Sequence, residues 1–412
     1  MQSYVKLALK VLGRRKVFTL ISLFGIAMTL AVLVVATAIL DDAFEPRAPQ
    51  SRFDRVLAIT MVSMIGPRST ETMNPGYRLI HDYIYTLPGI EAATAFSEPA
   101  QIGIYRNGGR TDAQFKRTDA AYWRVLDFRF LAGRPFTADE EERGALVAVI
   151  SDGLRKRLFR REAALGRSME IDGRDFRVIG VVPDVPITRF AAYSDVWVPH
   201  TTARSSDYRH ELMGNYNGIV LARTRNDLPR LKSEFAARVK RIPIDDPKRF
   251  NRVAASLDTP FESFSRGAFP ARFGYDAAAV MRIILTILTL LFMTLPALNL
   301  ITLNLSRILE RASEIGVRKA FGASRGALVM QFVFENVVLT LIGGAMALVT
   351  GAALIAALNR VDIIPNAQFA LNVRVLLYGL VLAAFFGIFS GVYPAWRMSR
   401  LHAVDALRGG AQ

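Results

Sequence analysis

Hydrophobic residues gather in four long stretches of the chain, and each stretch contains a long run without Asp, Glu, Lys or Arg. A helix needs about 20 apolar residues to cross the hydrocarbon core of a bilayer. Lipid offers the backbone no hydrogen bonds, so such stretches must be helical. We therefore predict four transmembrane helices, at 17–40, 280–306, 328–359 and 375–396.

The region between the first two predicted spans, 41–279, has a different pattern. Ser168–Val182 contains two alternating apolar and polar runs joined by Asp172-Gly173, which is a strong hairpin signal. Two amphipathic helices are expected at 77–87 and 228–242, and strands at 55–59, 147–150, 195–198 and 219–222. Asp227 is the predicted cap of the second helix. We predict a large mixed α+β domain, followed by a turn-rich linker at 259–282.

Basic residues dominate three short segments beside the predicted spans, 1–16, 307–327 and 397–412. Lys and Arg flanking a span stay in the cytoplasm, so both termini and the 307–327 elbow are expected there. The domain at 41–279 and the short loop at 360–374 are then outside. The architecture is a membrane α-helical protein with both termini inside and a large extracytoplasmic domain between helices 1 and 2.

Patterns for catalysis and cofactor binding are missing from the sequence. It has no cysteine, which excludes disulfides and thiol catalysis. It also has no Gly-Lys dipeptide, which a phosphate-binding P-loop needs. The histidines show no metal-binding spacing. We therefore expect no catalytic residue, no bound cofactor, no metal and no nucleic-acid partner, and we expect that the chain is not an enzyme.

The predicted spans lack the ionisable groups that line ion-coupled transport paths, so we expect them to transmit movement rather than cargo. Pro296 removes a backbone hydrogen bond within the second span and is a candidate hinge. Gly343, Gly344, Ala347 and Gly351 form a stripe of small residues that allows close helix packing. That stripe could face a second protomer or a neighbouring helix of the same chain.

Two further charged features have ordinary structural explanations. Glu335 is expected at the start of the third span, where a helix N-terminus and the lipid headgroups both suit a carboxylate. The basic run from Arg155 to Arg161 is expected to be a solvated face rather than a binding site for an acidic partner.

The polar segment SEIGVRKAFGAS, residues 313–324, separates the second and third predicted spans. Glu314 and Arg318 stand at i and i+4, which supports a short helix. Gly322 can end that helix in a left-handed turn, and Ser324 can cap the next one. Physical chemistry alone leaves two roles open for this amphipathic elbow, attachment to anionic lipid and docking of a cytoplasmic partner.

The same region resembles the FtsX-type permease domain of ABC systems. That family shows Arg-x-x-Glu-Ile-Gly-x-Arg-x-Ala-x-Gly-Ala, then Gln-Phe-x-x-Glu and a Gly-Gly pair. The matching residues are Arg311, Glu314, Ile315, Gly316, Arg318, Ala320, Gly322, Ala323, Gln331, Phe332, Glu335, Gly343 and Gly344. The tail YPAWRMSRLHAVDALRGG resembles the end of that domain, although a proline is missing and Asp405 replaces a glutamate. The resemblance covers 280–408.

The extracytoplasmic region resembles the MacB-type periplasmic core domain. The likeness rests on Gly133-Arg134-Pro135-Phe136, Val147-Ala148-Val149, Leu158-Phe159, Leu165-Gly166 and Val178-Ile179-Gly180-Val181-Val182. With the permease match, it covers nearly all of the chain.

The two resemblances imply a dimeric permease of the bacterial inner membrane on which cytoplasmic ABC ATPase subunits act. ATP and Mg²⁺ would be bound by the ATPase, and the second protomer would be identical or related. The implied ATPase-coupling residues are Arg311, Glu314, Ile315, Gly316, Arg318, Lys319 and Gly322. MacB carries a fused ATPase, so a separately encoded ATPase is expected here. A periplasmic adaptor and an outer-membrane channel are further partners that the resemblance allows.

Three functions fit this arrangement. The first is export or efflux of a peptide, a drug-like compound or another envelope cargo by mechanotransmission. The second is release of lipoproteins, for which no apolar groove or hook is evident in the sequence. The third is FtsX-like regulation of an envelope hydrolase or sensor, although the FtsX insert is small and this one is large.

Charge reversal at the elbow tests the docking role. We expect Glu314→Lys to uncouple binding of the partner ATPase while folding and membrane insertion persist, because it reverses a charge on the surface that the resemblance assigns to docking. Co-purification of the ATPase with the variant would measure this. Unchanged recovery of the ATPase would contradict the docking assignment.

Overall fold

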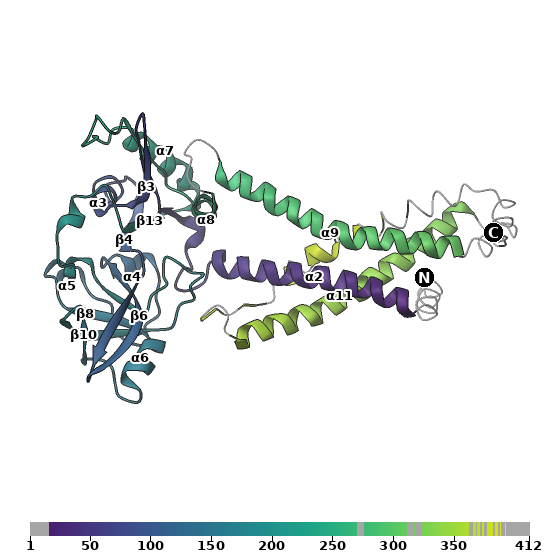
Figure 1. Cartoon of the computed structure of the whole chain (residues 1–412), viewed down its shortest axis with the longest axis horizontal. Helices are drawn as coiled ribbons and strands as arrows, with labels where there is room; N and C mark the ends of the chain where they lie inside the picture. Colours follow the sequence, from purple (N-terminus) through teal and green to yellow (C-terminus); the bar gives the residue numbers. More distant parts are fainter. Residues whose placement is uncertain are drawn as a thin grey trace. The chain divides into compact units, whose positions relative to one another are not determined.

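The computed structural model describes residues 16–269, 276–310, 317, 324–361, 366–367, 369–370, 373–374, 377–381, 384–385, 388 and 392. The chain divides into two compact units, which are described separately (Figure 1). The helical unit comprises Met1–Asp41, Arg282–Ile363 and Gln368–Gln412. The α/β unit comprises Asp42–Met281 and Ile364–Ala367.

Three long helices account for the apolar stretches that the structure describes. They are α2 (Lys16–Phe44), α9 (Ala277–Glu310) and α11 (Arg325–Val361). Thr19–Phe44 and Val333–Val361 are long and apolar enough to cross a membrane. Most of 360–374 and of the fourth predicted span, 375–396, lies outside the described residues.

Helices α2 and α11 pack closely because α11 presents small residues to α2. A Cβ added at Gly343 would lie 2.7 Å from Cγ2 of Ile26, and one added at Gly351 would lie 3.4 Å from Cγ1 of Val34. Ala347 is buried in a cluster with Ile26, Ala27 and Leu30. The stripe predicted from the sequence therefore faces a neighbouring helix of the same chain at these positions.

Glu335 is not at the start of its helix. It lies well past Arg325, where α11 begins, and its side chain is buried. Its Oε1 accepts a hydrogen bond from Nε2 of Gln331 at 3.1 Å, one turn earlier. The expectation of a helix-start glutamate was wrong because the helix extends further toward the N-terminus than the uncharged run of the sequence does.

The α/β unit is built on one large mixed sheet. In spatial order its strands are β1 (Val56–Ile59), β13 (Tyr216–Ala222), β4 (Ile90–Ser97), β6 (Gly109–Thr118), β11 (Val196–Pro199), β8 (Val147–Ser151), β10 (Arg174–Val182), β9 (Ser168–Ile171) and β5 (Ala100–Arg106), with β7 (Ala132–Gly133) paired to β10. Most neighbours are antiparallel, but β11 is parallel to β6 and β10 is parallel to β8.

Part of this sheet closes on itself. The path from β6 through β11, β8, β10 and β9 reaches β5, and β5 pairs back with β6 from Ala100↔Phe115 to Arg106↔Gly109. The enclosed core is apolar and includes Phe115, Ile150 and Phe176. The predicted hairpin is β9–β10, whose turn residues Asp172 and Gly173 have φ of 50° and 71°. A turn with both central residues at positive φ matches the strand twist, so this short loop suffices.

A second layer covers the β1–β13–β4 part of the sheet. It contains α3 (Tyr77–Tyr83), α7 (Leu228–Val239) and a smaller sheet of β12 (Met213–Gly214), β3 (Thr70–Pro75), β2 (Val62–Ile65) and β14 (Arg252–Ala255) (Figure 1). Their apolar faces share one core with Leu57 and Val220. Asp227 is the N-cap residue of α7, as predicted, but its carboxylate accepts from N–H and Oγ1 of Thr224 and makes no capping bond to the helix.

The remaining helices of the α/β unit are short. They are α4 (Tyr122–Val125), α5 (Ala138–Glu142), α6 (Asp152–Phe159) and α8 (Pro260–Ala268). The centre of the unit is rich in aromatic side chains, with Trp123, Trp197 and Phe128 in mutual edge-to-face contact.

Alanine substitutions at two glycines of α11 separate the effect of helix packing on stability from the effect of helix propensity. Ala favours a helix over Gly by up to about 1 kcal/mol. At Gly326 an added Cβ would meet nothing within 4 Å, whereas at Gly343 it would press on Ile26. We expect Gly343→Ala to lower the melting temperature in detergent and Gly326→Ala to leave it unchanged or raise it. Equal shifts would contradict the α2–α11 packing.

Lys116 of β6 provides a pH test of the α/β core. Burial lowers the pKa of Lys116 to about 7, against about 10.4 for a solvated lysine. Between these two pKa values Lys116 is protonated in the unfolded chain and neutral in the folded protein. The free energy of unfolding should therefore rise with pH in this range. We expect the wild-type melting temperature to rise relative to that of Lys116→Met between about pH 7 and pH 9.5. A constant difference would show that Lys116 is not buried in this way.

Candidate force-transmission site

The residues selected from the sequence lie mostly outside the region that the structure describes. The seven elbow residues predicted to couple to an ATPase, from Arg311 to Gly322, are all in this group. Pro296 lies within α9, which is helical without interruption from Ala277 to Glu310, and its hinge role stays a prediction. Across the described ranges, no group of three or more acidic or histidine side chains could hold a metal ion.

The structure draws attention instead to the end of α2. Thr188, in the loop between β10 and β11, donates from Oγ1 to Oδ2 of Asp42 at 2.6 Å. Arg189 donates from Nη1 to the carbonyl of Arg47 at 2.9 Å and from Nη2 to the carbonyl of Glu45 at 3.4 Å. Both carbonyls lie just after Phe44, the last residue of α2, and that of Arg47 also accepts from the N–H of Gln50 at 2.6 Å. Thr188 and Arg189 therefore tie the end of α2 and the segment that follows it to the β10–β11 loop. All of these residues belong to the α/β unit.

The loop holds Arg189 in a tight turn. Its N–H donates to the carbonyl of Pro186 at 3.0 Å, and its own carbonyl accepts from the N–H groups of Ala192 and Tyr193 at 2.9 and 2.8 Å. The side chain is buried, and this desolvation lowers the pKa of Arg189, while the nearby Asp42 carboxylate acts in the opposite direction. A buried guanidinium needs hydrogen-bond partners for its donors. The α2 end provides them.

The same loop is tied to the interior of the α/β unit. Lys116 donates from Nζ to the carbonyls of Phe190 and Ala191, at 3.0 and 2.9 Å. Tyr122 of α4 donates from Oη to the carbonyl of Ala191 at 2.8 Å. Arg189 is therefore adjacent in sequence to backbone that the central sheet and α4 hold in place.

A second attachment of the α2 end is aromatic. The ring of Phe44, the last residue of α2, makes edge contacts with Phe261 and Phe264 of α8, with centroids 5.8 and 5.4 Å apart. Edge-to-face pairs at such distances contribute about 0.5–1.5 kcal/mol each beyond the burial of area.

Helix α8 is in turn joined to two other elements. Arg266 forms a two-point ion pair with Asp258, at 2.6 and 3.0 Å. The backbone of Asp258 exchanges hydrogen bonds with Ala58 of β1, at 2.7 and 2.8 Å. Lys232 of α7 contacts Glu262 of α8 at 2.5 Å. The α2 end is thus connected through α8 to both the large sheet and α7.

The linker predicted at 259–282 was wrong in its first part, because residues 260–268 form α8. Thr259 and Glu262 form a capping box, in which each side chain accepts from the backbone N–H of the other. Pro260 stands at the first helical position. These are the sequence signals of a helix start, and they could have identified α8. The role of Arg189 had no comparable local signal, since its partners lie about 140 residues earlier.

We name these residues, namely Asp42, Phe44, Glu45, Arg47, Thr188, Arg189, Phe261 and Phe264, the α2 joint. The one hydroxyl of the joint, that of Thr188, donates to the Asp42 carboxylate at 2.6 Å, and we assign this pair a structural role in holding the α2 end. It can hold the end of α2 by polar contacts on one side and aromatic contacts on the other. The end of α2 is therefore in contact with the β10–β11 loop and with α8 at the same time.

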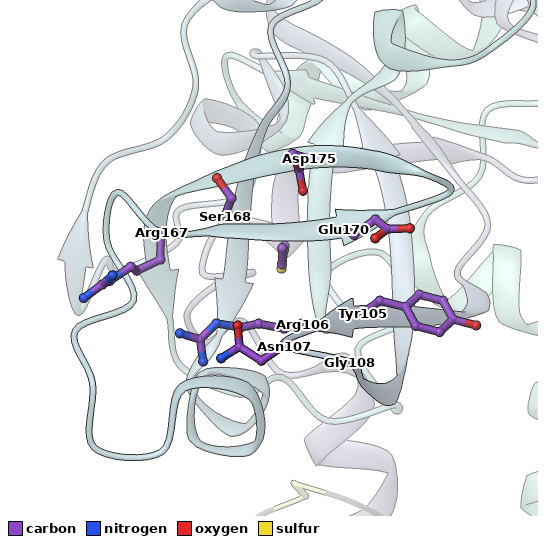
Figure 2. A pocket seen from close by; sticks show the side chains of 9 residues that line it. Tyr105, Arg106, Asn107, Gly108, Arg167, Ser168, Glu170 and Asp175 are labelled. Carbon is purple, nitrogen blue, oxygen red and sulfur yellow. The ribbon is translucent and has the colours of Figure 1, made fainter.

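A surface pocket of about 500 Å³ is a second candidate, lined by the β5–β6 turn and the β9–β10 hairpin (Figure 2). Tyr105 and Arg167 point toward opposite ends of it, as Figure 2 shows. Arg106 is already engaged by Glu162 at 2.7 Å and by the carbonyl of Leu158 at 2.8 Å. The polar groups do not converge on one point, so the pocket supports no specific chemistry.

The basic run on α6 is partly neutralised within the α/β unit. Arg155 and Lys156 contact Asp152 at 2.6 and 2.7 Å, and Arg157 contacts Asp195 at 3.1 Å. These pairs are consistent with the expected solvated face.

Comparison with known proteins relates the chain to one group of transporters. Residues 19–238 match the MacB-like periplasmic core domain, and residues 280–403 match the FtsX-like permease C-terminal domain. The Bacillus subtilis protein named "Uncharacterized ABC transporter permease YknZ" is 26% identical over 332 residues, which cover 78% of this chain and 76% of that protein. The structure of the YknZ extracellular domain aligns with 48% of this chain at 18% identity and a TM-score of 0.37.

Proteins named "Macrolide export ATP-binding/permease protein MacB" are also similar. The one from Sodalis glossinidius is 26% identical over 428 residues, covering 97% of this chain and 60% of that protein. The one from Bdellovibrio bacteriovorus is 28% identical over 280 residues, covering 67% and 41%. This chain thus spans less than two thirds of the length of both MacB proteins. With its core-domain match extending over more than half of its length, the chain belongs to the MacB/FtsX-type family of ABC transporter permeases.

Proposed function

We propose that the chain is the permease subunit of an ATP-driven transporter of the mechanotransmission type. Permeases of this family are membrane proteins with a periplasmic domain that work with a cytoplasmic ATPase. In the proposed mechanism, ATP hydrolysis by that partner moves the membrane helices, and the α2 joint passes the movement to the α/β unit. No step of chemistry takes place in this chain.

The observation that carries the proposal is the α2 joint. One end of an apolar helix is held at several points, by Arg189 and Thr188 on one side and by Phe261 and Phe264 on the other. These groups are attached separately, through Lys116 to the central sheet and through α8 to α7. A flexible tether would need none of these contacts. A connection that transmits force needs them.

The proposal includes the membrane topology predicted from the sequence. We infer four spans with both termini in the cytoplasm of a bacterium, a dimer of identical or related permeases in the inner membrane, and ATPase docking at the 307–327 elbow. The α/β unit would then lie on the periplasmic side, where it could meet an adaptor and an outer-membrane channel.

Export or efflux is the favoured activity, since relatives that align along much of this chain are named as macrolide exporters. Lipoprotein release and regulation of an envelope hydrolase or sensor are the alternatives. Turnover of the partner ATPase separates them. Stimulation by a peptide or drug-like compound supports export, stimulation by a lipoprotein supports release, and stimulation confined to an envelope enzyme supports regulation.

Substitution of Arg189 tests the transmission mechanism. Arg189→Ala removes the donors to the Arg47 and Glu45 carbonyls but leaves the elbow and the spans unchanged. We expect normal recovery of the partner ATPase and a loss of cargo-stimulated turnover in nanodiscs of about 5- to 150-fold, the usual range of coupling between sites.

Arg155→Ala on α6 is the matched control, because it removes a more exposed arginine that pairs within its own helix. It should leave stimulation unchanged. Melting temperatures of both variants identify any loss due to unfolding. Full stimulation in a folded Arg189→Ala protein would contradict transmission through the joint.

A further inference from the structure

Three large apolar side chains in or next to the α2 joint are exposed to solvent. Ile187 and Phe190, which flank Thr188 and Arg189, are 51% and 40% exposed. Phe264, which contacts Phe44, is 49% exposed. We call these three residues the apolar collar. Exposed apolar side chains are common singly, but several on the segments that hold one helix end indicate a contact surface.

The sequence at the end of α2 indicates where the neighbourhood of the collar lies relative to a bilayer. The apolar run of α2 ends at Leu40, and Asp41 and Asp42 are the first acidic residues after it. The edge of the hydrocarbon core therefore lies near this point, since carboxylates avoid that core. Phe44 is three residues further, or about 4.5 Å along a helix with a rise of 1.5 Å per residue.

That depth places Phe44 within the headgroup layer. The hydrocarbon core is about 30 Å thick and the whole bilayer about 40–45 Å, so each headgroup layer extends about 5–8 Å. The Phe264 ring lies 5.4 Å from that of Phe44, and Thr188, next to Ile187, contacts Asp42 at 2.6 Å. Both attachments of the α2 end therefore carry an apolar side chain beside a residue at the level of the interface.

We propose that the apolar collar is a lipid-contacting surface, with Ile187, Phe190 and Phe264 inserted among the headgroups and upper acyl chains of the leaflet where α2 ends. Phe and large aliphatic side chains are the groups that interfacial segments bury at the boundary between headgroups and acyl chains. Lipid contact by the collar requires that α2 spans the membrane, and it does not depend on ATPase coupling or on the cargo.

The chain has no native cysteine, so single spin labels can be placed without background changes. We would label Ile187→Cys, Phe190→Cys and Phe264→Cys in the full-length protein, reconstituted in vesicles of phosphatidylethanolamine and phosphatidylglycerol. Collision with oxygen, which concentrates in lipid, is compared with collision with a water-soluble nickel chelate. Controls of similar exposure are Met73→Cys on β3 and Leu165→Cys before β9, which are 53% and 42% exposed.

We expect the three collar labels to collide mainly with oxygen and the two control labels mainly with the nickel chelate. A nickel-chelating lipid should broaden the collar spectra alone. Collar labels that behave like the controls would overturn the proposal. Protection from both reagents would also overturn it, because a protein surface, such as a second copy of the chain, would then cover the collar.

Two checks separate a loss of lipid contact from a loss of folding or of ATPase coupling. Phe264→Cys loses a ring contact with Phe44, so its melting temperature is compared with that of the unsubstituted protein. If that variant is unstable, Ile187→Cys and Phe190→Cys decide the question alone. Failure of ATPase coupling in the Arg189→Ala experiment would leave the spin-label result unaffected, so the two proposals can fail separately.

Discussion

The contacts of Arg189 with the carbonyls of Glu45 and Arg47 are the interaction on which the α2 joint depends. Both carbonyls follow Phe44, the last residue of α2, and that of Arg47 also accepts from the N–H of Gln50 at 2.6 Å. Water could bond to the same carbonyls, but water would not tie this segment to the β10–β11 loop. The guanidinium of Arg189 does so at two points, because it offers several donors in one rigid plane.

A joint transmits displacement only if the body behind it resists deformation. The closed part of the large sheet provides that resistance, since β5 pairs with both β6 and β9 and encloses a packed apolar core. Close-packed interiors respond to strain by moving as a whole rather than by yielding locally. Lys116 links this body to the Arg189 loop through two backbone carbonyls. The closed sheet and the buried Lys116 thus both hold the Arg189 loop in place.

Local features were predictable from the sequence, and long-range ones were not. The β9–β10 hairpin followed from alternation and from Asp172-Gly173, because turn and register are both encoded nearby. The parallel pairing of β11 with β6 was beyond reach, since it joins Val196 to Phe115, which lie far apart in the sequence. Arg189 was missed for the same reason. Asp227 misled because a carboxylate before a helix can serve the preceding turn as well as the helix.

The packing between α2 and α11 bears on whether cargo could pass through the membrane along this seam. Gly343, Ala347 and Gly351 leave room for Ile26 and Val34, and the result is a close contact between apolar surfaces. A hydrated path needs polar groups to replace the hydration of its cargo. None of these five side chains offers one, although α2 and α11 also bury the polar side chains of Ser22, Glu335, Asn336 and Thr340. At these five positions the contact is apolar packing between two helices rather than the wall of a channel. This supports the proposal that the helices transmit movement, which would reach the α/β unit at the α2 joint.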